Sequence, residues 1–431
     1  MSNLNITDLD PKILVPHPRN SRVHSDAQID LLAESIGALG FNKPVILGPG
    51  NQIIAGHGAV RAALKLGLAT IPTIDISHLT EEQRRAFMIA DNRLAELSHF
   101  DAEILAIELE ELSVIDMPFE PTVLGFEPAE IDVIIEDQRK TQAESDPDDE
   151  PVAALAVEKV ARLGDLWLLG RHRLFVGSAL DRVSYQVLLG ADRAQMVISD
   201  PPFNVPIAGH VSGLGKIKHS EFVAGSGELS PDEFVAFLRT AMLQLIDFSV
   251  NGSIHFLFMD WRGIKSLLAA GEVYTELKNI CCWVKSNGAG MGSLYRSQHE
   301  LIAVFKSGKD KHRNLIRLGQ WGRNRSNVWT APGMAGFQKG RMEKLAMHPT
   351  VKPVGLIADA ILDCSQRGDL ILDPFGGSGT LALAAERTGR TAALMELDPH
   401  YADVTLRRFC DATDIEPVNA FTGQIVRRRE V

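Results

Sequence analysis

The sequence is poor in cysteine, in aromatic residues and in long apolar runs, and each shortage argues against a class of protein. Its 431 residues contain four cysteines, none in a Cys-x-x-Cys pair, and only 6% aromatic residues. A zinc ribbon, a thioredoxin-type site and a disulfide scaffold are therefore not expected. There is neither an uninterrupted apolar run of about 18 residues nor a cationic segment leading into an apolar one at the N-terminus. We expect a soluble, cytoplasmic protein with no membrane segment and no metal site.

An excess of positive charge is also missing. The chain has 44 Lys and Arg against 55 Asp and Glu, a net charge of −11. This excludes a uniformly basic protein that coats nucleic acid, but not a local basic face. Acids concentrate in residues 144–150 (ESDPDDE), which repel one another and cannot bury apolar surface. We interpret this stretch as a solvated linker, with a surface loop inside one domain as the alternative.

The linker divides the chain into three predicted segments: a smaller domain over 1–135, an acidic linker over 136–158 and a larger domain over 159–431. In the smaller domain, helix-like and strand-like patterns alternate, which indicates an α+β fold. In the larger domain, short apolar strands alternate with amphipathic helices. That pattern is typical of an α/β fold with a mostly parallel sheet covered by helices on both faces.

A glycine-rich turn follows the apolar run at residues 370–372. Residues 373–380 read DPFGGSGT and lead into a helical pattern. Glycines at the end of a parallel strand let the backbone approach a ligand, and the next helix presents free N–H groups. Glu396 ends the following strand, 20 residues after Gly376, a spacing at which an acid reaches ribose hydroxyls. The pattern favours an adenosyl or dinucleotide site over a structural turn, and the leading Asp373 suits a cationic ligand. Asp398 has the alternative role of capping the next helix.

A second polar loop follows the apolar strand at 196–198. It reads Ser-Asp-Pro-Pro-Phe-Asn over 199–204. Prolines remove backbone donors, so only acceptors face inward, and Asp200 adds a carboxylate acceptor beside the ring of Phe203. Acceptors next to an aromatic ring can hold an exocyclic amine while stacking the base that carries it. The alternative is a rigid turn with a capping aspartate.

Together these loops resemble those of the β-class DNA amino-methyltransferases. The 199–203 segment resembles their DPPY/F motif, and 373–380 resembles their S-adenosylmethionine loop. Residues 348–353 (HPTVKP) resemble the motif preceding that loop, and 295–300 (YRSQHE) also match the family. The catalytic motif comes before the cofactor motif, which is the order of the β class. One departure is Val176-Gly177-Ser178, where the family commonly has Gly-Asp.

The resemblance implies a Rossmann-like methyltransferase fold, S-adenosylmethionine as the cofactor and double-stranded DNA as the substrate. It assigns catalytic roles to Asp200, Pro201, Pro202 and Phe203. It assigns cofactor binding to Lys352, Asp373, Phe375, Gly377, Gly379, Thr380 and Glu396. The implied reaction is methyl transfer to the N6 amine of adenine, with the target base flipped out of the duplex. N4-cytosine methylation is the nearest alternative, because both products need the same acceptor geometry.

Residues 53–63 (IIAGHGAVRAA) resemble the ParB/sulfiredoxin-like domain, in which the equivalent turn binds phosphate groups. No cysteine precedes Cys281, which excludes sulfiredoxin-type chemistry. Of the arginine cluster of partition proteins, only Arg61 is present. For His57, a structural role and a ligand role are equally compatible with the sequence.

Basic residues gather between 285 and 344, where twelve Lys and Arg stand against three acids. Phosphate neutralisation makes this stretch the expected DNA face. The predicted contacts, which include a glycine-containing loop before the stretch, are Lys216, Lys218, Arg296, Arg323 and Arg325. A DNA-binding regulatory protein with a decayed methyltransferase half is the rival function, but the intact motif residues argue against decay. The sequence decides neither the recognition site nor whether the protein forms a homodimer.

Overall fold

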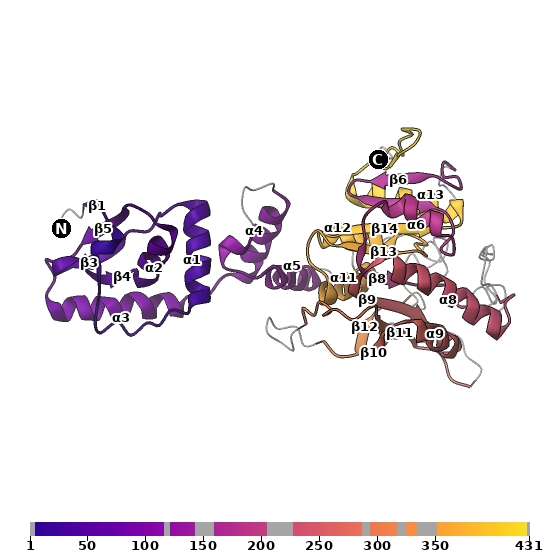
Figure 1. Ribbon diagram of the computed structural model, residues 1–431, viewed down its shortest axis with the longest axis horizontal. Coiled ribbons are helices and arrows are strands. Elements are labelled where there is room, and N and C mark those ends of the chain that lie inside the picture. The colour runs from indigo at the N-terminus through magenta and orange to yellow at the C-terminus, as the bar shows by residue number, and fades with distance from the viewer. Residues whose placement is uncertain are drawn as a thin grey trace. The chain divides into compact units, whose positions relative to one another are not determined.

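The protein folds into two compact units. The computed structural model describes residues 5–115, 121–142, 159–204, 227–286, 294–316, 325–333 and 351–428. The units are Met1–Gln142 and Ala143–Val431 (Figure 1). Each has hydrophobic clusters of its own, so each is a separate body with its own core.

The first unit is built on a five-stranded mixed sheet with the order β1-β5-β3-β4-β2. Its strands are β1 (Ile6–Leu9), β2 (Val15–Pro16), β3 (Val45–Gly48), β4 (Gln52–Ala55) and β5 (Ile71–Asp75). The helices described in this unit are α1 (Asp26–Leu39), α2 (His57–Leu66), α3 (Glu81–Leu97), α4 (Ala102–Val114) and α5 (Pro128–Gln142). This is the α+β arrangement that the sequence predicts.

Helix boundaries in this unit follow from local capping. Thr80 and Gln83 form a reciprocal capping box at the start of α3, and Asp101 caps α4. The sequence missed α5, which runs to Gln142 and so occupies the first seven residues of the predicted linker. Apolar residues of α5 pack against Leu109 of α4, so tertiary contact stabilises this helix despite its polar C-terminal end. The acidic stretch 144–150 lies outside the described residues.

The second unit is built on a ten-stranded sheet with the order β12-β10-β11-β9-β8-β13-β14-β7-β6-β15. Its strands are β6 (Leu166–Leu169), β7 (His172–Val176), β8 (Ala194–Ser199), β9 (Ser249–Met259), β10 (Glu276–Lys285), β11 (His299–Lys306), β12 (Val328–Ala331), β13 (Leu370–Asp373), β14 (Thr391–Glu396) and β15 (Val418–Asn419). Only β11 and β6 run against the other strands, so the sheet is mostly parallel as predicted.

Helices cover both faces of this sheet. They are α6 (Arg182–Leu189), α8 (Pro231–Asp247), α9 (Ile264–Ala270), α11 (Val354–Cys364), α12 (Thr380–Arg387) and α13 (Pro399–Thr413). Helices α11, α12 and α13 share one hydrophobic cluster with the sheet, and α6, α8 and α9 share the other. Neighbouring strand residues such as Ile371 and Leu372 belong to opposite clusters, because side chains alternate along a strand. This explains why the central strands are apolar throughout.

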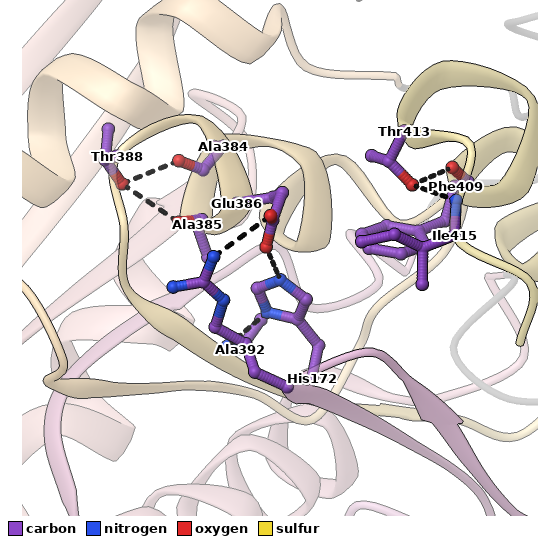
Figure 2. Close-up of polar contacts among 10 residues, drawn as sticks. His172, Ala384, Ala385, Glu386, Thr388, Ala392, Phe409, Thr413 and Ile415 are labelled. Carbon is purple, nitrogen blue, oxygen red and sulfur yellow. Dashed lines mark hydrogen bonds and ion pairs between the residues drawn. The ribbon is translucent and has the colours of Figure 1, made fainter. Parts of the chain in front are cut away.

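A buried histidine fixes the C-terminal end of α12 to the sheet (Figure 2). The backbone N–H of Ala392 donates to Nδ1 of His172 at 2.9 Å, so Nε2 carries the proton and donates to Glu386 at 2.7 Å. Burial lowers the pKa of His172 even though Glu386 raises it. Arg171 adds an ion pair to the same carboxylate at 3.0 Å, on a far more exposed side. The contact therefore joins β7, α12 and β14 at the end of α12 that is opposite the glycine-rich turn.

We predict that Glu386→Ala lowers the free energy of unfolding of the second unit by about 1–3 kcal/mol, because it leaves a buried N–H donor without an acceptor. Arg171→Ala should cost no more than about 1 kcal/mol, because it removes only an exposed ion pair. Urea unfolding followed by tryptophan fluorescence measures both, since all five tryptophans lie between residues 167 and 329. Equal losses in the two variants would contradict the importance of the buried contact.

Candidate active site

Four neighbouring parallel strands end at one edge of the large sheet. They lie in the order β8, β13, β14 and β7, and they end at Ser199, Asp373, Glu396 and Val176. The carboxyl edge of a parallel sheet is where ligands bind in open α/β folds. The two loops that the sequence singles out therefore begin side by side, although they are far apart along the chain.

The loop after β8, residues 200–204, is called the acceptor loop below and is partly buried. Asp200 is half-buried, Pro201 is buried, and Pro202 and Phe203 are partly exposed. Asn204 follows with a positive φ of 55°, which an asparagine tolerates better than most residues. Its side chain donates to the carbonyl of Leu229 at 2.7 Å and accepts from the N–H of Gly227 at 3.0 Å. These bonds fix the turn directly behind Phe203.

The glycine-rich turn after β13, residues 373–380, is called the cofactor loop below. It is held by contacts from α13. Gly379, the N-cap residue of α12, has a φ of +78°, and a Cβ there would lie 2.6 Å from the Thr405 side chain. The Thr405 hydroxyl donates to the carbonyl of Gly377 at 2.8 Å. Arg408 donates to the hydroxyl of Thr380 at 2.9 Å. The turn is thus pre-formed by this chain's own contacts, and Phe375 stands partly exposed at its front.

A hydrogen bond connects the start of one loop to the start of the other. The hydroxyl of Ser199 donates to Asp373 Oδ1 at 2.7 Å, and the same oxygen accepts the N–H of Phe375 at 3.0 Å. Burial raises the pKa of Asp373 to about 7, although the bond from Ser199 lowers it. The negative charge of Asp200 contributes to the rise, so the two carboxylates lie close enough to influence each other.

Glu396 lies at the same edge with its carboxylate oriented by the backbone. The backbone N–H of Gly377 donates to Oε2, and the backbone N–H of Asp398 donates to Oε1, both at 2.8 Å. Burial raises the pKa of Glu396 to about 7. Asp398 caps α13 by accepting from His400 N–H, the alternative role that the sequence left open. Asp181 likewise caps α6.

The composition of this edge fits an adenosyl cofactor. Residues 373–380 contain a carboxylate and hydroxyls but no basic side chain, which suits a cationic ligand and disfavours a diphosphate. Each oxygen of Glu396 has a second lone pair, so the carboxylate can accept hydroxyl donors in addition to its backbone bonds. Asp373, Phe375, Gly377, Gly379, Thr380 and Glu396 are the residues that would hold such a cofactor.

Lys352 contacts both loops. Its Nζ lies 2.5 Å from Asp200 Oδ2 and 3.1 Å from Glu300 Oε2. Its carbonyl accepts from the Thr380 hydroxyl of the cofactor loop at 3.3 Å, and its positive charge lowers the pKa of Asp373. The side chain therefore pairs with the acceptor loop next to the cofactor loop, and its cofactor role stays a prediction.

Sequence reasoning missed two residues of this cluster, Glu300 and Lys285. Lys285 Nζ lies 2.7 Å from Glu300 Oε1, next to the Lys352 contact. Glu300 ends the YRSQHE segment that supported the resemblance, and it is followed by an apolar strand. A glutamate at the entrance to a buried strand was the signal that could have identified it.

The five predicted DNA contacts differ in their surroundings. Lys216, Lys218 and Arg323 lie outside the described residues, and Arg296 is exposed. Arg325, however, pairs inside the protein with Asp359 at 3.2 Å and Asp363 at 3.3 Å. Its guanidinium is directed to α11, so we withdraw its assignment to DNA.

Other cations of the basic stretch are also engaged internally. Lys285 pairs with Glu300, and Arg313 pairs with Asp369. The local charge excess counted from the sequence thus overstates what the described part of this stretch offers to DNA.

The turn before α2 in the first unit is a tight structural corner. Gly56 has a φ of +99°, and Nε2 of His57 accepts the backbone N–H of His17 at 3.3 Å. Burial lowers the pKa of His57 to about 4, so the ring is neutral near pH 7. Arg61 pairs with Asp26 at 3.0 Å. These contacts favour the structural role of His57.

Comparison with known proteins agrees with this geometry. Residues 194–407 match the DNA methylase family of the N6/N4 type. The chain therefore carries a DNA methylase domain of that family. Residues 1–93 match the ParB N-terminal domain, and residues 103–163 match the ParB-methyltransferase helix-turn-helix domain, which the sequence analysis did not foresee. The methylase thus carries a ParB-like module, as the resemblance indicated.

Three relatives illustrate the two halves. The methylase is 24% identical over 255 residues to the type II methyltransferase M2.MboI of Moraxella bovis, covering 56% of this chain and 89% of that protein. It is 38% identical over 82 residues to the DNA adenine methyltransferase YhdJ of Escherichia coli, covering 19% and 26%. Its N-terminal part is 43% identical over 72 residues to the ParB-like nuclease domain-containing protein YnaK of the same species, covering 17% and 83%.

Two further features concern only the described part of the chain. None of its helices is both long enough and apolar enough to cross a bilayer. Nor do three or more His, Cys, Asp or Glu side chains gather there in a way that could hold a metal ion.

The two raised pKa values predict how stability depends on pH. The folded methylase holds protons on Asp373 and Glu396 up to about pH 7, whereas the unfolded chain releases them near the ordinary values of 3.8 and 4.5. Their contribution to the free energy of unfolding is therefore fully present below about pH 4 and is lost as the pH rises through 7. Glu396→Gln removes one of the two groups, so its melting temperature should fall less between pH 5 and pH 8 than that of the parent.

Tryptophan fluorescence melts at the two pH values measure this difference. The matched control is Glu272→Gln, which changes an exposed glutamate of the same unit and should keep the parental pH dependence. Parallel behaviour of Glu396→Gln and the parent would show that Glu396 does not take up a proton on folding.

Proposed function

We propose that the methylase transfers a methyl group from S-adenosylmethionine to the exocyclic N6 of adenine in double-stranded DNA. One observation carries the proposal: the acceptor loop with Asp200 and the cofactor loop with Asp373 leave adjacent parallel strands and are joined by the Ser199 hydrogen bond. Methyl transfer needs this proximity, because the amine must attack the methyl carbon in line with the bond that breaks.

The acceptor loop supplies the chemistry that the amine needs. An exocyclic amine is a weak nucleophile, because its lone pair is delocalised into the ring. Asp200 and the carbonyl of Pro201 accept its two N–H bonds, which moves the nitrogen towards a tetrahedral geometry and frees the lone pair. Pro202 fixes the turn, and Phe203 stacks against the flipped base. The new N–C bond forms as the S–C bond breaks, and the methylated nitrogen gives up one of its two protons, which Asp200 accepts. Orientation and electrostatics account for catalysis, without a covalent enzyme intermediate.

The cofactor loop holds the methyl donor in place. S-adenosylmethionine supplies an activated methyl group on a positively charged sulfur. Glu396 accepts the ribose hydroxyls, and Asp373 adds negative charge beside the cation. Phe375 borders the site, and Gly377, Gly379 and Thr380 provide the close backbone approach at the start of α12.

Adenine rather than cytosine is favoured by an aspartate at position 200, on the resemblance to DPPY/F enzymes. The E. coli relative named a DNA adenine methyltransferase supports the same choice. Mass spectrometry of nucleosides from treated DNA decides the question. N6-methyladenine is the expected product, N4-methylcytosine would establish the alternative, and no methylated nucleoside would overturn the proposal.

Asp200→Ala should abolish methyl transfer while leaving S-adenosylmethionine affinity within a few-fold of the parent, because Asp200 contacts the base rather than the cofactor. Transfer of tritium-labelled methyl groups and calorimetry measure the two properties. The matched control is Asp192→Ala, which changes an exposed aspartate just before the start of β8, whereas Asp200 follows the end of β8. This variant should keep the parental turnover. Near-normal turnover of Asp200→Ala would refute the mechanism.

The ParB-like part is proposed to assist DNA engagement and to be dispensable for chemistry. The match to a helix-turn-helix domain over 103–163 supports this role. A chain that begins at residue 151 should bind the cofactor normally and methylate DNA with weaker affinity or altered site choice. Loss of all turnover in a folded, cofactor-binding truncated protein would contradict this division of labour.

A further inference from the structure

Four charged side chains form a continuous chain behind the acceptor loop. Lys352 lies between the carboxylates of Asp200 and Glu300, at 2.5 and 3.1 Å, and Lys285 closes the chain at 2.7 Å from Glu300. Asp200 follows β8, Glu300 lies on β11, Lys285 ends β10, and Lys352 precedes α11. With two acids and two bases, the four side chains together carry no net charge when all are ionised.

The centre of this chain is removed from water. The side chain of Lys352 is 6% exposed and that of Glu300 is 10% exposed. The Lys352 ammonium lies 5.6 Å from the ring centre of Phe203, 5.2 Å from that of Phe258 and 5.9 Å from that of Trp283. A cation held among aromatic rings keeps part of its stabilisation through their electron-rich faces.

Stability alone does not account for four linked charges at this place, two of them buried. Removing ions from water is costly, and well-packed apolar residues often replace buried ion pairs without loss of stability. The chain instead ends on the one carboxylate that the proposed reaction requires as an acceptor. Its geometry therefore points to a role in controlling that carboxylate.

We propose that Lys352 and Glu300 are positioning residues that act on the base-binding carboxylate: Lys352 keeps Asp200 ionised and fixed, and Glu300 weakens the grip of Lys352 so that Asp200 still accepts the amine. This role rests on the proposed methyl transfer. A lysine bound to Asp200 alone would compete strongly with the N–H donors of the base. A lysine shared with Glu300 orients the same carboxylate and competes less.

The charges that face Asp200 agree in direction with this role. Burial raises the pKa of Asp200 to about 6, Lys352 and Lys285 lower it, and Glu300 raises it. Asp373 is the other acid that interacts with it across the site. Although burial acts against the charge, Asp200 and Glu300 hold the pKa of Lys352 above its ordinary value. Lys352 is therefore a permanent cation at working pH, and Asp200 titrates.

The two neighbours should consequently shift the pH profile in opposite directions. The measurement is kcat/KM for DNA at pH 5.5 divided by its value at pH 8, for the full-length protein. Glu300→Gln removes a negative charge and should raise this ratio about threefold. Lys352→Met removes a positive charge and should lower it by about threefold or more. The ratio cancels any uniform loss of activity, so it separates positioning from a general structural defect.

Two further variants complete the test. Lys352→Arg keeps the charge and should keep the parental ratio even if kcat falls. Asp359→Asn, which alters the Arg325 ion pairs of the same unit, should lower stability without changing the ratio.

An unchanged ratio in a folded, cofactor-binding Glu300→Gln protein would overturn the role, whether or not Lys352→Met folds. A parent protein that methylates no DNA would instead overturn the proposed function, and this role with it.

Discussion

The parallel pairing of β8 with β13 is the constraint on which the candidate site depends. It aligns Met196 with Ile371 and Val197 with Leu372, so both strands end at the same edge. Ser199 and Asp373 are 174 residues apart along the chain, yet they share a 2.7 Å hydrogen bond. A sheet shifted by one residue would turn Ser199 away from Asp373, because successive side chains point to opposite faces.

Charge around this edge is arranged by burial rather than by exposed ion pairs. Asp200, Asp373 and Glu396 all have raised pKa values, and burial is the largest cause for each. Repulsion from Asp200 raises the pKa of Asp373, and repulsion from Asp373 raises that of Glu396. A cationic ligand would relieve this repulsion. In the proposed reaction, the same arrangement would favour a bound sulfonium and place an acceptor beside it.

Patterns confined to one segment were predictable from the sequence. The α12 start after Gly379 and the acid at the end of β14 were expected where they occur. Each is a local signal that needs no knowledge of distant contacts. The parallel sheet followed from the alternation of apolar strands with amphipathic helices.

Contacts between distant segments were not predictable in this way. Lys352 was assigned to the cofactor because its motif precedes the cofactor loop, but its side chain crosses to Asp200, 152 residues away. Arg325 looked like a DNA contact because it lies in a basic stretch, although Asp359 and Asp363 neutralise it within the fold. A charge count along the sequence cannot register such partners. Helix α5 was missed because its stability comes from packing against α4.

The central claim is that the acceptor loop and the cofactor loop form one continuous site. The most direct test is the affinity of a single molecule in which the N6 of adenine is linked covalently to the methyl-bearing position of the cofactor. The account predicts that this molecule binds at least about tenfold more tightly than S-adenosylmethionine, and that Asp200→Ala loses this gain while keeping its affinity for the cofactor. Equal affinity for the linked molecule and the cofactor alone would contradict the claim.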